Sequence, residues 1–302
     1  MVDLRIQLPD GFLDEEVRCG YTVPAWMKKV WAVELDLLAE FARVCEANHI
    51  QWFPEAGTLL GAVRHGGFIP WDDDIDVMLT REDYNRLCAI ADTAFRHPYF
   101  FQTEYNDPGS LRGHAQLRNS DTAAFSPTEL ERGYTYNKGI FIDIFPYDNV
   151  PDDPAERRRF LKELKRAKRK MREHARWSSR FEHKLIPPTW LVRRAISCWH
   201  RHTVYIDTSY ADFEAVAARY DGAPTEEMGL IIFKPATTQC IYRRKDFSGQ
   251  LSMPFEMLQV PVPTGYDDIL TRTYGNWHAF VQGCGYHGGL IFDTSKSYQE
   301  YE

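Results

Sequence analysis

The 302-residue sequence has little of what marks a secreted, membrane-spanning or zinc-ribbon protein. Its six cysteines are scattered and form no Cys-x-x-Cys pair, which argues against a disulfide framework and favours a reducing compartment. The N-terminus has no basic segment followed by an apolar one, as a signal peptide would have. No apolar run approaches the roughly 18 residues that a spanning helix needs. These absences predict a cytoplasmic protein.

Positive charge is also scarce, except in one block. The net charge of −7 argues against a nucleic-acid binder that works by bulk electrostatics. Residues 156–201 carry sixteen Lys or Arg and four Glu, a net of +12, so the rest of the chain carries −19. We interpret this block as part of a helical insertion over about 152–205. It either contacts the inner membrane face or an anionic acceptor, or it is a solvated helix packed on the core.

The remaining pattern alternates helices and strands, as in an α/β (α+β) core with a mixed sheet flanked by helices. Helices are expected at 25–48, 58–63, 81–94 and 266–274, the second and third capped by Thr58 and Thr80. Strands are expected at 50–53, 75–79 and 139–145, the last ended by Pro146, with two more within 99–125. No internal repeat interrupts this order, and one domain over 1–302 is expected.

Four of the five residues from Asp72 to Asp76 are aspartates, and they precede an apolar strand. Alternate residues of a strand share a face, so Asp74 and Asp76 should lie about 6–7 Å apart on one side. Oxygen ligands in this arrangement suit Mg²⁺ or Mn²⁺, and a cation would relieve the repulsion between the carboxylates. A solvated turn is the alternative. An EF-hand loop is excluded because Val77 and Asp83 occupy the positions that need Gly and Glu.

A third acid stands far away in the sequence. Asp143 is the only charged residue of the apolar stretch GIFIDIF, where an acid without a partner is costly. Together with Asp74 and Asp76 it predicts a three-carboxylate metal site of the kind used in phosphoryl chemistry. The alternative is a structural acid that accepts hydrogen bonds from the backbone or from an arginine.

Candidate anion-binding residues lie around these acids. Gly57 and Thr58 open a predicted helix, whose first N–H groups favour an anion. Arg64 and His65 end the same segment, and Arg118 lies on a predicted strand, where an arginine can hold a phosphate with two hydrogen bonds. Each of these residues alone is more often an ordinary surface or turn residue.

The stretches GTLLGAVRHGGFIPWDDDIDV, REDYNRL and GIFIDIFPYDNVP together resemble the LicD family. That family includes bacterial phosphocholine transferases and fukutin-related proteins. The resemblance is dense over residues 34–150. It implies a nucleotidyltransferase-like fold and transfer of a substituted phosphate from a CDP-linked donor to a glycan hydroxyl. It also implies that Asp74, Asp76 and Asp143 are metal ligands and catalytic residues, and that Gly57 and Thr58 begin the donor-phosphate site.

The sequence is therefore compatible with three functions. The first is transfer of phosphocholine or a polyol phosphate from CDP-choline or a CDP-polyol to a cell-surface glycan, free or lipid-linked, or to its precursor. The second is transfer of NMP from an NTP to a small molecule, and the third is a non-catalytic scaffold that binds nucleotide or glycan. A choline group would favour an aromatic cage, for which Trp52, Trp71, Tyr134 and Tyr136 are candidates.

Overall fold

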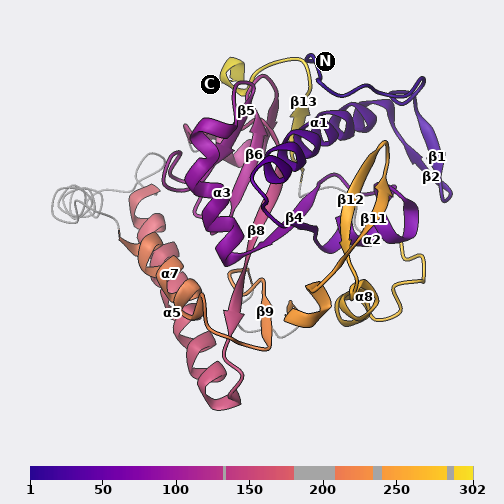
Figure 1. Cartoon of the computed structure of the whole chain (residues 1–302). Helices are drawn as coiled ribbons and strands as arrows, with labels where there is room; N and C mark the ends of the chain where they lie inside the picture. The colour runs from indigo at the N-terminus through magenta and orange to yellow at the C-terminus, as the bar shows by residue number, and fades with distance from the viewer. Residues whose placement is uncertain (132–133, 180–207, 234–239, 284–288, 302) are drawn as a thin grey trace, which may run out of the picture.

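The computed structural model describes residues 1–131, 134–179, 208–233, 240–283 and 289–301. A mixed sheet runs through the centre, and α1 and α3 lie across one of its faces (Figure 1). The pair α5 and α7 packs side by side at one edge, while α2, α8 and a β-hairpin gather at the other (Figure 1). This arrangement confirms the α/β class with a mixed, helix-flanked sheet.

Seven strands form the central sheet. Five of them follow one another in the order β10 (Ile241–Arg243), β9 (Glu227–Gly229), β8 (Ile140–Val150), β4 (Asp76–Thr80) and β3 (Phe53–Pro54). β8 also pairs with β6 (Ala115–Asn119), which pairs with β5 (Tyr99–Gln102). β4 and β8 are parallel, and the other pairings in this sheet are antiparallel. Two strands that are distant in the sequence therefore lie next to each other at its centre.

Three smaller antiparallel pairs complete the strands. They are β1 (Glu16–Arg18) with β2 (Tyr21–Val23), β7 (Ala123–Phe125) with β13 (Ile291–Asp293), and β11 (Gln250–Phe255) with β12 (Leu258–Pro263). The last of these hairpins is not among the strands expected from the sequence. Arg18 joins the first and last pairs: its guanidinium donates two hydrogen bonds to Glu256, at 2.5 and 2.9 Å.

The helices of the described residues are α1 (Ala25–Ala47), α2 (Ala56–His65), α3 (Arg81–Ala94), α4 (Pro127–Glu131), α5 (Pro154–Ser179), α7 (Ser209–Ala217) and α8 (Tyr266–Tyr274). Single 3₁₀ turns are η1 (Ala218–Tyr220), η2 (Arg244–Phe247) and η3 (Tyr298–Tyr301). The helices expected at 25–48, 81–94 and 266–274 are confirmed. The Thr80 cap is confirmed too, since its hydroxyl accepts the Asp83 amide at 3.2 Å.

α1 covers the sheet with an unusually wide apolar face. Val30, Trp31, Leu37 and Phe41 are each at most 1% exposed, and burying a side chain of this size stabilises the fold by about 1.5–3 kcal/mol. Trp31 stacks on Phe68 with 4.4 Å between ring centroids and an interplanar angle of 2°. This stacking packs α1 against the loop that precedes β4. That loop carries the aspartate run.

The prediction that Pro146 ends its strand was wrong, because β8 continues to Val150. Pairing with β6 covers Ile140 to Ile144, and pairing with β9 begins only at Asp148. Pro146 therefore lies where the neighbour on that edge changes. A proline is tolerated there because its missing N–H has no partner to lose.

Two other predicted elements were displaced. The strand expected at 50–53 is the short β3, at Phe53–Pro54. The helix expected from Thr58 begins at Ala56, with Glu55 at its N-cap and no capping hydrogen bond from a side chain. Thr58 is therefore inside the first turn, and its predicted role as N-cap was wrong.

A buried ion pair ties the sheet to the helices at its edge. The Arg81 guanidinium, at the start of α3, donates to both carboxylate oxygens of Asp148 on β8, at 2.6 and 3.1 Å. It also donates to Glu214 on α7 at 3.1 Å. Removing one member of such a pair typically costs about 3–5 kcal/mol, because the other charge is left buried without a partner.

The basic block is helical where the structure describes it. Its first part forms α5, with Phe160, Leu164 and Met171 buried toward the core, and residues 180–201 lie outside the described residues. Within the described ranges, no helix combines the length and apolarity needed to cross a bilayer. A single domain over 1–302 remains a prediction.

Candidate active site

A cavity of about 570 Å³ opens between α2, the aspartate run and the segment that follows α8. Its wall includes an acidic side, an aromatic side and one arginine. The lining residues used below are Gly57, Arg64, Trp71, Asp72, Asp74, Asp76, Tyr274 and Trp277. The cavity is large enough for part of a nucleotide-sized ligand.

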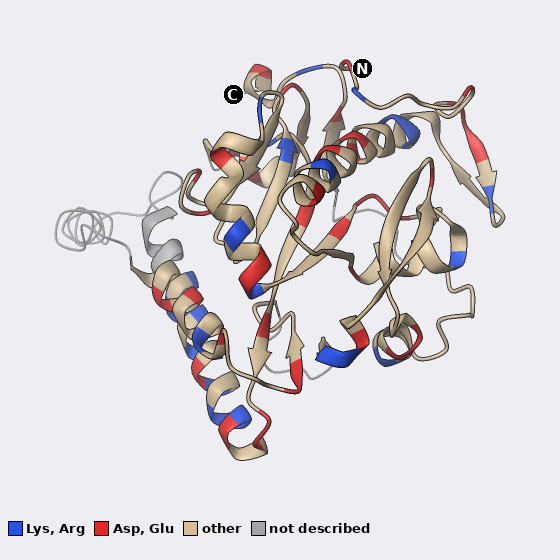
Figure 2. Ribbon diagram, viewed as in Figure 1, with Lys and Arg blue, Asp and Glu red and all other residues tan. Residues whose placement is uncertain are grey.

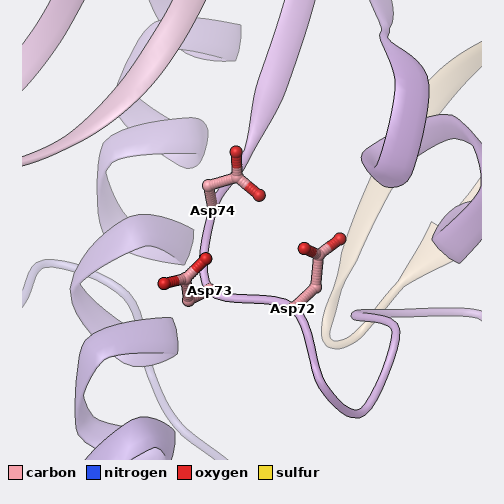
Figure 3. A group of neighbouring side chains, drawn as sticks. All are labelled: Asp72, Asp73 and Asp74. Carbon is pink, nitrogen blue, oxygen red and sulfur yellow. The ribbon is translucent and has the colours of Figure 1, made fainter. Parts of the chain in front are cut away.

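The aspartates alternate in direction, as an extended backbone requires. Asp72, Asp74 and Asp76 are half-buried and line the cavity. Asp73 is only 3% exposed and lies on the other side of the run. Asp72, Asp73 and Asp74 each offer a carboxylate oxygen within 4.8 Å of the others (Figure 3). The predicted shared face of Asp74 and Asp76 is therefore present, and Asp72 extends it.

Asp143 is the register partner of Asp76 on the neighbouring strand β8. Its Oδ1 accepts hydrogen bonds from His114 Nε2 at 3.0 Å and from Gln116 Nε2 at 2.6 Å. Burial alone would raise the pKa of Asp143, but the contacts with His114 and Gln116 outweigh it and lower that pKa. The pKa of Asp76 is instead raised well above its usual range, by burial first and then by Asp74 and Asp143.

Gly57 and Thr58 contact the aspartates of the acidic side. A Cβ on Gly57 would come within 2.6 Å of Asp72 Oδ2, so only glycine lets this carboxylate approach the start of α2. Thr58 is 4% exposed, and its hydroxyl accepts the Asp76 backbone N–H at 2.8 Å. Gly57 therefore faces the cavity, whereas Thr58 holds Asp76 in place.

Arg64 and His65 are the last two residues of α2. Arg64 Nη1 donates to the carbonyls of Trp277 and Ala279, at 2.9 and 3.1 Å. These bonds fold the segment after α8 over the cavity, and Arg64 still lines it. His65 receives a hydrogen bond from Arg64 Nε at 3.0 Å. The pKa of His65 is lowered to about 4 by burial, Arg64 and Arg18, so the ring is neutral at pH 7.

Arg118 lies elsewhere. It is 1% exposed, and its guanidinium donates to Gln102 Oε1 and Gly139 O, both at 2.6 Å, and to Gln116 Oε1. The predicted phosphate contact requires Arg118 at the cavity wall. The structure does not bring this arginine there. It orients the Gln116 amide, which in turn donates to Asp143.

Several residues of the site were missed by sequence reasoning. Glu34 on α1 is 1% exposed, and its pKa is raised by burial first and then by Asp74, Asp73, Asp72 and Asp143. A signal existed, since Glu34 is an acid one turn from Val30 and from Leu38 within the apolar stripe of the predicted helix. His114, Tyr274 and Trp277 carried no such signal.

Of the four aromatic candidates, Trp71 lines the cavity. Trp52 packs edge-on against Phe41 in the core. Tyr134 and Tyr136 stack on each other with 5.3 Å between centroids and do not line the cavity. The aromatic side is completed from the other end of the chain, by Tyr274 and Trp277.

The donor set of the acidic side fits a hard divalent cation. Its side-chain ligands are carboxylate oxygens, without a thiolate or an imidazole among Asp72, Asp74 and Asp76. Oxygen-only ligands suit Mg²⁺ or Mn²⁺. A cation would also balance these carboxylates, since burial first and then repulsion from Asp74 and Asp143 raise the pKa of Asp76.

The chain is similar in sequence to known proteins. Residues 49–175 match the family described as LicD/FKTN/FKRP, nucleotidyltransferase domain. The lipopolysaccharide cholinephosphotransferase LicD of Haemophilus influenzae is 30% identical over 249 residues, which cover 80% of this chain and 88% of that protein. The human ribitol 5-phosphate transferase FKRP is 41% identical over 84 residues, 24% of this chain and 17% of FKRP. The chain therefore belongs to the LicD family.

Proposed function

We propose that the chain transfers a substituted phosphate, phosphocholine or a polyol phosphate, from a CDP-linked donor to a hydroxyl of a cell-surface glycan or its precursor. The observation that carries the proposal is the cavity whose wall includes Asp72, Asp74, Asp76 and Arg64, in a chain of this family. The names of the relatives supply the chemistry: one transfers cholinephosphate and the other ribitol 5-phosphate.

Asp74, Asp76 and Asp143 would hold Mg²⁺ or Mn²⁺. A cation held there would supply positive charge to stabilise the charge that develops on the phosphate oxygens. Gly57, at the start of α2, and Arg64 would receive the donor phosphates, since both line the cavity. Thr58 and Arg118 would act indirectly, through Asp76 and through Gln116 and Asp143. His65 would support Arg64.

The reaction is a displacement at phosphorus. The acceptor oxygen attacks the β-phosphorus of the donor, the bond to the bridging oxygen breaks, and CMP leaves with that oxygen. The acceptor proton goes to a base. Asp143 is a candidate for it, because its hydrogen bonds keep the carboxylate ionised and able to accept a proton.

A donor screen tests this function. The protein would be supplied with CDP-choline, CDP-ethanolamine, CDP-glycerol and CDP-ribitol, and CMP release would be measured with Mg²⁺ and with excess EDTA. We expect release with one donor class and none with EDTA. Pyrophosphate release from an NTP, with no CMP from any CDP-linked donor, would instead favour the nucleotidyltransferase alternative. Binding without either product would favour a scaffold.

The basic helix α5 is the candidate surface for the side of the protein that meets the acceptor. Its exposed side chains Arg158, Lys162, Lys165 and Arg166 form a stripe on the face opposite the core, and Figure 2 shows Lys and Arg along the length of the helix. We propose that this stripe, together with the rest of 156–201, contacts an anionic membrane surface that carries the acceptor. Each cation near such a surface contributes about 1 kcal/mol.

Liposome co-sedimentation checks the membrane contact. We expect binding to anionic vesicles that weakens with added salt, and at least a tenfold loss, about 1.4 kcal/mol, when Arg158, Lys162 and Lys165 become Gln. The control replaces three exposed basic residues elsewhere, Arg96, Lys245 and Lys296, with Gln, so the net charge changes equally. Equal recovery with anionic and neutral vesicles at low salt would contradict the proposal.

A further inference from the structure

Phe233 is an aromatic ring left on the surface at the end of a buried segment. Residues 230–232 are at most 8% exposed, whereas Phe233 is 48% exposed. Lys168 on α5 is itself buried, and its ammonium group donates hydrogen bonds to the carbonyls of Ile232 and Phe233. The backbone is therefore anchored from within, and the ring is held at a fixed place on the surface.

The anchored ring lies against the residue that supports Asp143. Its centroid is 5.7 Å from the His114 ring, at an interplanar angle of 36°, and 5.5 Å from Phe145, at 88°. His114 Nε2 in turn donates to Asp143 Oδ1 at 3.0 Å. The Asp143 side chain is 15% exposed. An exposed apolar ring is therefore one side chain away from the carboxylate that is the candidate base.

Asp143 stands between the strand that lines the cavity and the strand that leads to His114. Its register partners are Asp76 on β4 and Gln116 on β6, so β8 has a neighbour on either side here (Figure 1). The cavity wall includes Asp76 but not Asp143. His114 immediately precedes β6. A ligand on the β6 side can therefore reach Asp143 without entering the cavity.

The proposed displacement needs such a second approach. In phosphoryl transfer the attacking and leaving oxygens lie roughly in line, on opposite sides of the phosphorus. The proposed function places the donor phosphates in the cavity, beside Gly57 and Arg64. The acceptor must then approach from the side away from the leaving CMP. The β6 side of Asp143 meets this requirement.

Arg112 provides a polar group on the same side. Asp143, Gln116 and Gln102 form a row of register partners across β8, β6 and β5. Arg112 Nη1 donates to Gln102 Oε1 at 3.3 Å, and its side chain is 22% exposed. Two strand spacings, about 10 Å, separate this end of the row from Asp143. A sugar ring has apolar C–H faces that pack on an aromatic ring and hydroxyl oxygens that accept from a guanidinium.

We propose that Phe233 and Arg112 bind the sugar ring of the acceptor, with the hydroxyl to be modified directed at Asp143. The acceptor oxygen then bonds to phosphorus as the bond to CMP breaks, and Asp143 takes the hydroxyl proton. The inference rests on the proposed function and deepens it, because it assigns the acceptor to a surface distinct from the donor cavity.

Sugar binding to the full chain tests the inference without any donor present. Saturation-transfer NMR would be recorded with the methyl glycosides of galactose, glucose and N-acetylgalactosamine. We expect the wild type to bind at least one of them, and Phe233→Ala and Arg112→Gln each to bind it about tenfold more weakly. Phe233→Trp keeps an aromatic face and should bind as the wild type does. Leu251→Ala is the matched control, because Leu251 is an apolar residue of similar exposure, 42%, on β11.

Equal sugar affinity of the wild type and Phe233→Ala would overturn the inference, as would the absence of sugar binding by the wild type. Steady-state CMP release with the active donor gives a second readout. Phe233→Ala should raise KM for the sugar about tenfold without raising KM for the donor. CMP release with an unchanged sugar KM in this variant would leave the proposed function standing with its acceptor site elsewhere. Sugar binding that depends on Phe233, without CMP release from any donor, would do the reverse.

Discussion

Asp74→Asn and Asp76→Asn should each lower CMP release by at least about 10³-fold, equivalent to about 4 kcal/mol of transition-state stabilisation. Both carboxylates line the cavity, and they share the face on which we place the catalytic cation. Asparagine keeps the size of the side chain but offers a neutral oxygen, so the cation would lose a charged ligand. Steady-state CMP release over a range of Mg²⁺ concentrations measures the effect.

The same substitutions should not unfold the protein. The folded-state pKa of Asp76 is raised well above its value in the unfolded chain, by burial, Asp74 and Asp143. A raised carboxyl pKa gives stability that is present below the unfolded pKa and is lost as the pH rises. At pH 7 an ionised Asp76 therefore destabilises the cation-free fold. Asn removes that cost, so the melting temperature without Mg²⁺ should be equal or higher.

Thermal melting with and without Mg²⁺ separates a lost ligand from a damaged fold. Mg²⁺ should raise the melting temperature of the wild type by mass action and that of the variants much less. Asp92→Asn, an exposed acid on α3, is the control and should behave as the wild type. Near-normal turnover in an Asp74→Asn, Asp76→Asn double variant, or full wild-type activity in excess EDTA, would rule out this role.

Local pattern was sufficient to predict the acidic face of the site. Period-two alternation places Asp74 and Asp76 on one side, and Asp143 could be singled out because an acid interrupts an apolar strand. The parallel pairing of β4 with β8 makes Asp143 the neighbour of Asp76. That pairing joins residues 67 positions apart in the sequence, and neither strand alone specifies it.

The predictions that were wrong depend on contacts between distant segments. Thr58 accepts the Asp76 amide instead of capping its own helix, a choice made by the neighbouring strand. Arg118 is buried and donates to Gln102 and Gly139. This arginine, although of a type that suits a phosphate, therefore supports Asp143 instead. Trp277 lines the cavity, and the segment after α8 that carries it is held by the bond from Arg64 to its carbonyl. None of these contacts has a signature in local spacing.

Asp143→Ala should abolish CMP release and weaken cation binding, since we place Asp143 beside Asp76 in the same ligand set. The side chain is 15% exposed, so part of it can reach a bound ion. Its loss should also cost about 1–3 kcal/mol of stability, because it leaves the His114 and Gln116 donors without their acceptor. The lowered pKa of Asp143 adds to this cost at pH 7, where the ionised form stabilises the fold and acidification would remove that contribution.

Asp143→Asn distinguishes a ligand from a structural acid, because asparagine keeps an oxygen that accepts the bonds from His114 and Gln116 but loses the charge. If Asp143 holds the cation, this variant should fold normally and still release CMP at least about 10²-fold more slowly, a loss of about 2.7 kcal/mol. Gln116→Leu provides the comparison, since it removes one supporting donor and leaves the carboxylate in place. It should lower activity less than Asp143→Asn does. If Asp143 is only structural, the folded fraction of both Asp143 variants should keep normal specific activity and normal Mn²⁺ binding, with the whole effect seen in urea unfolding.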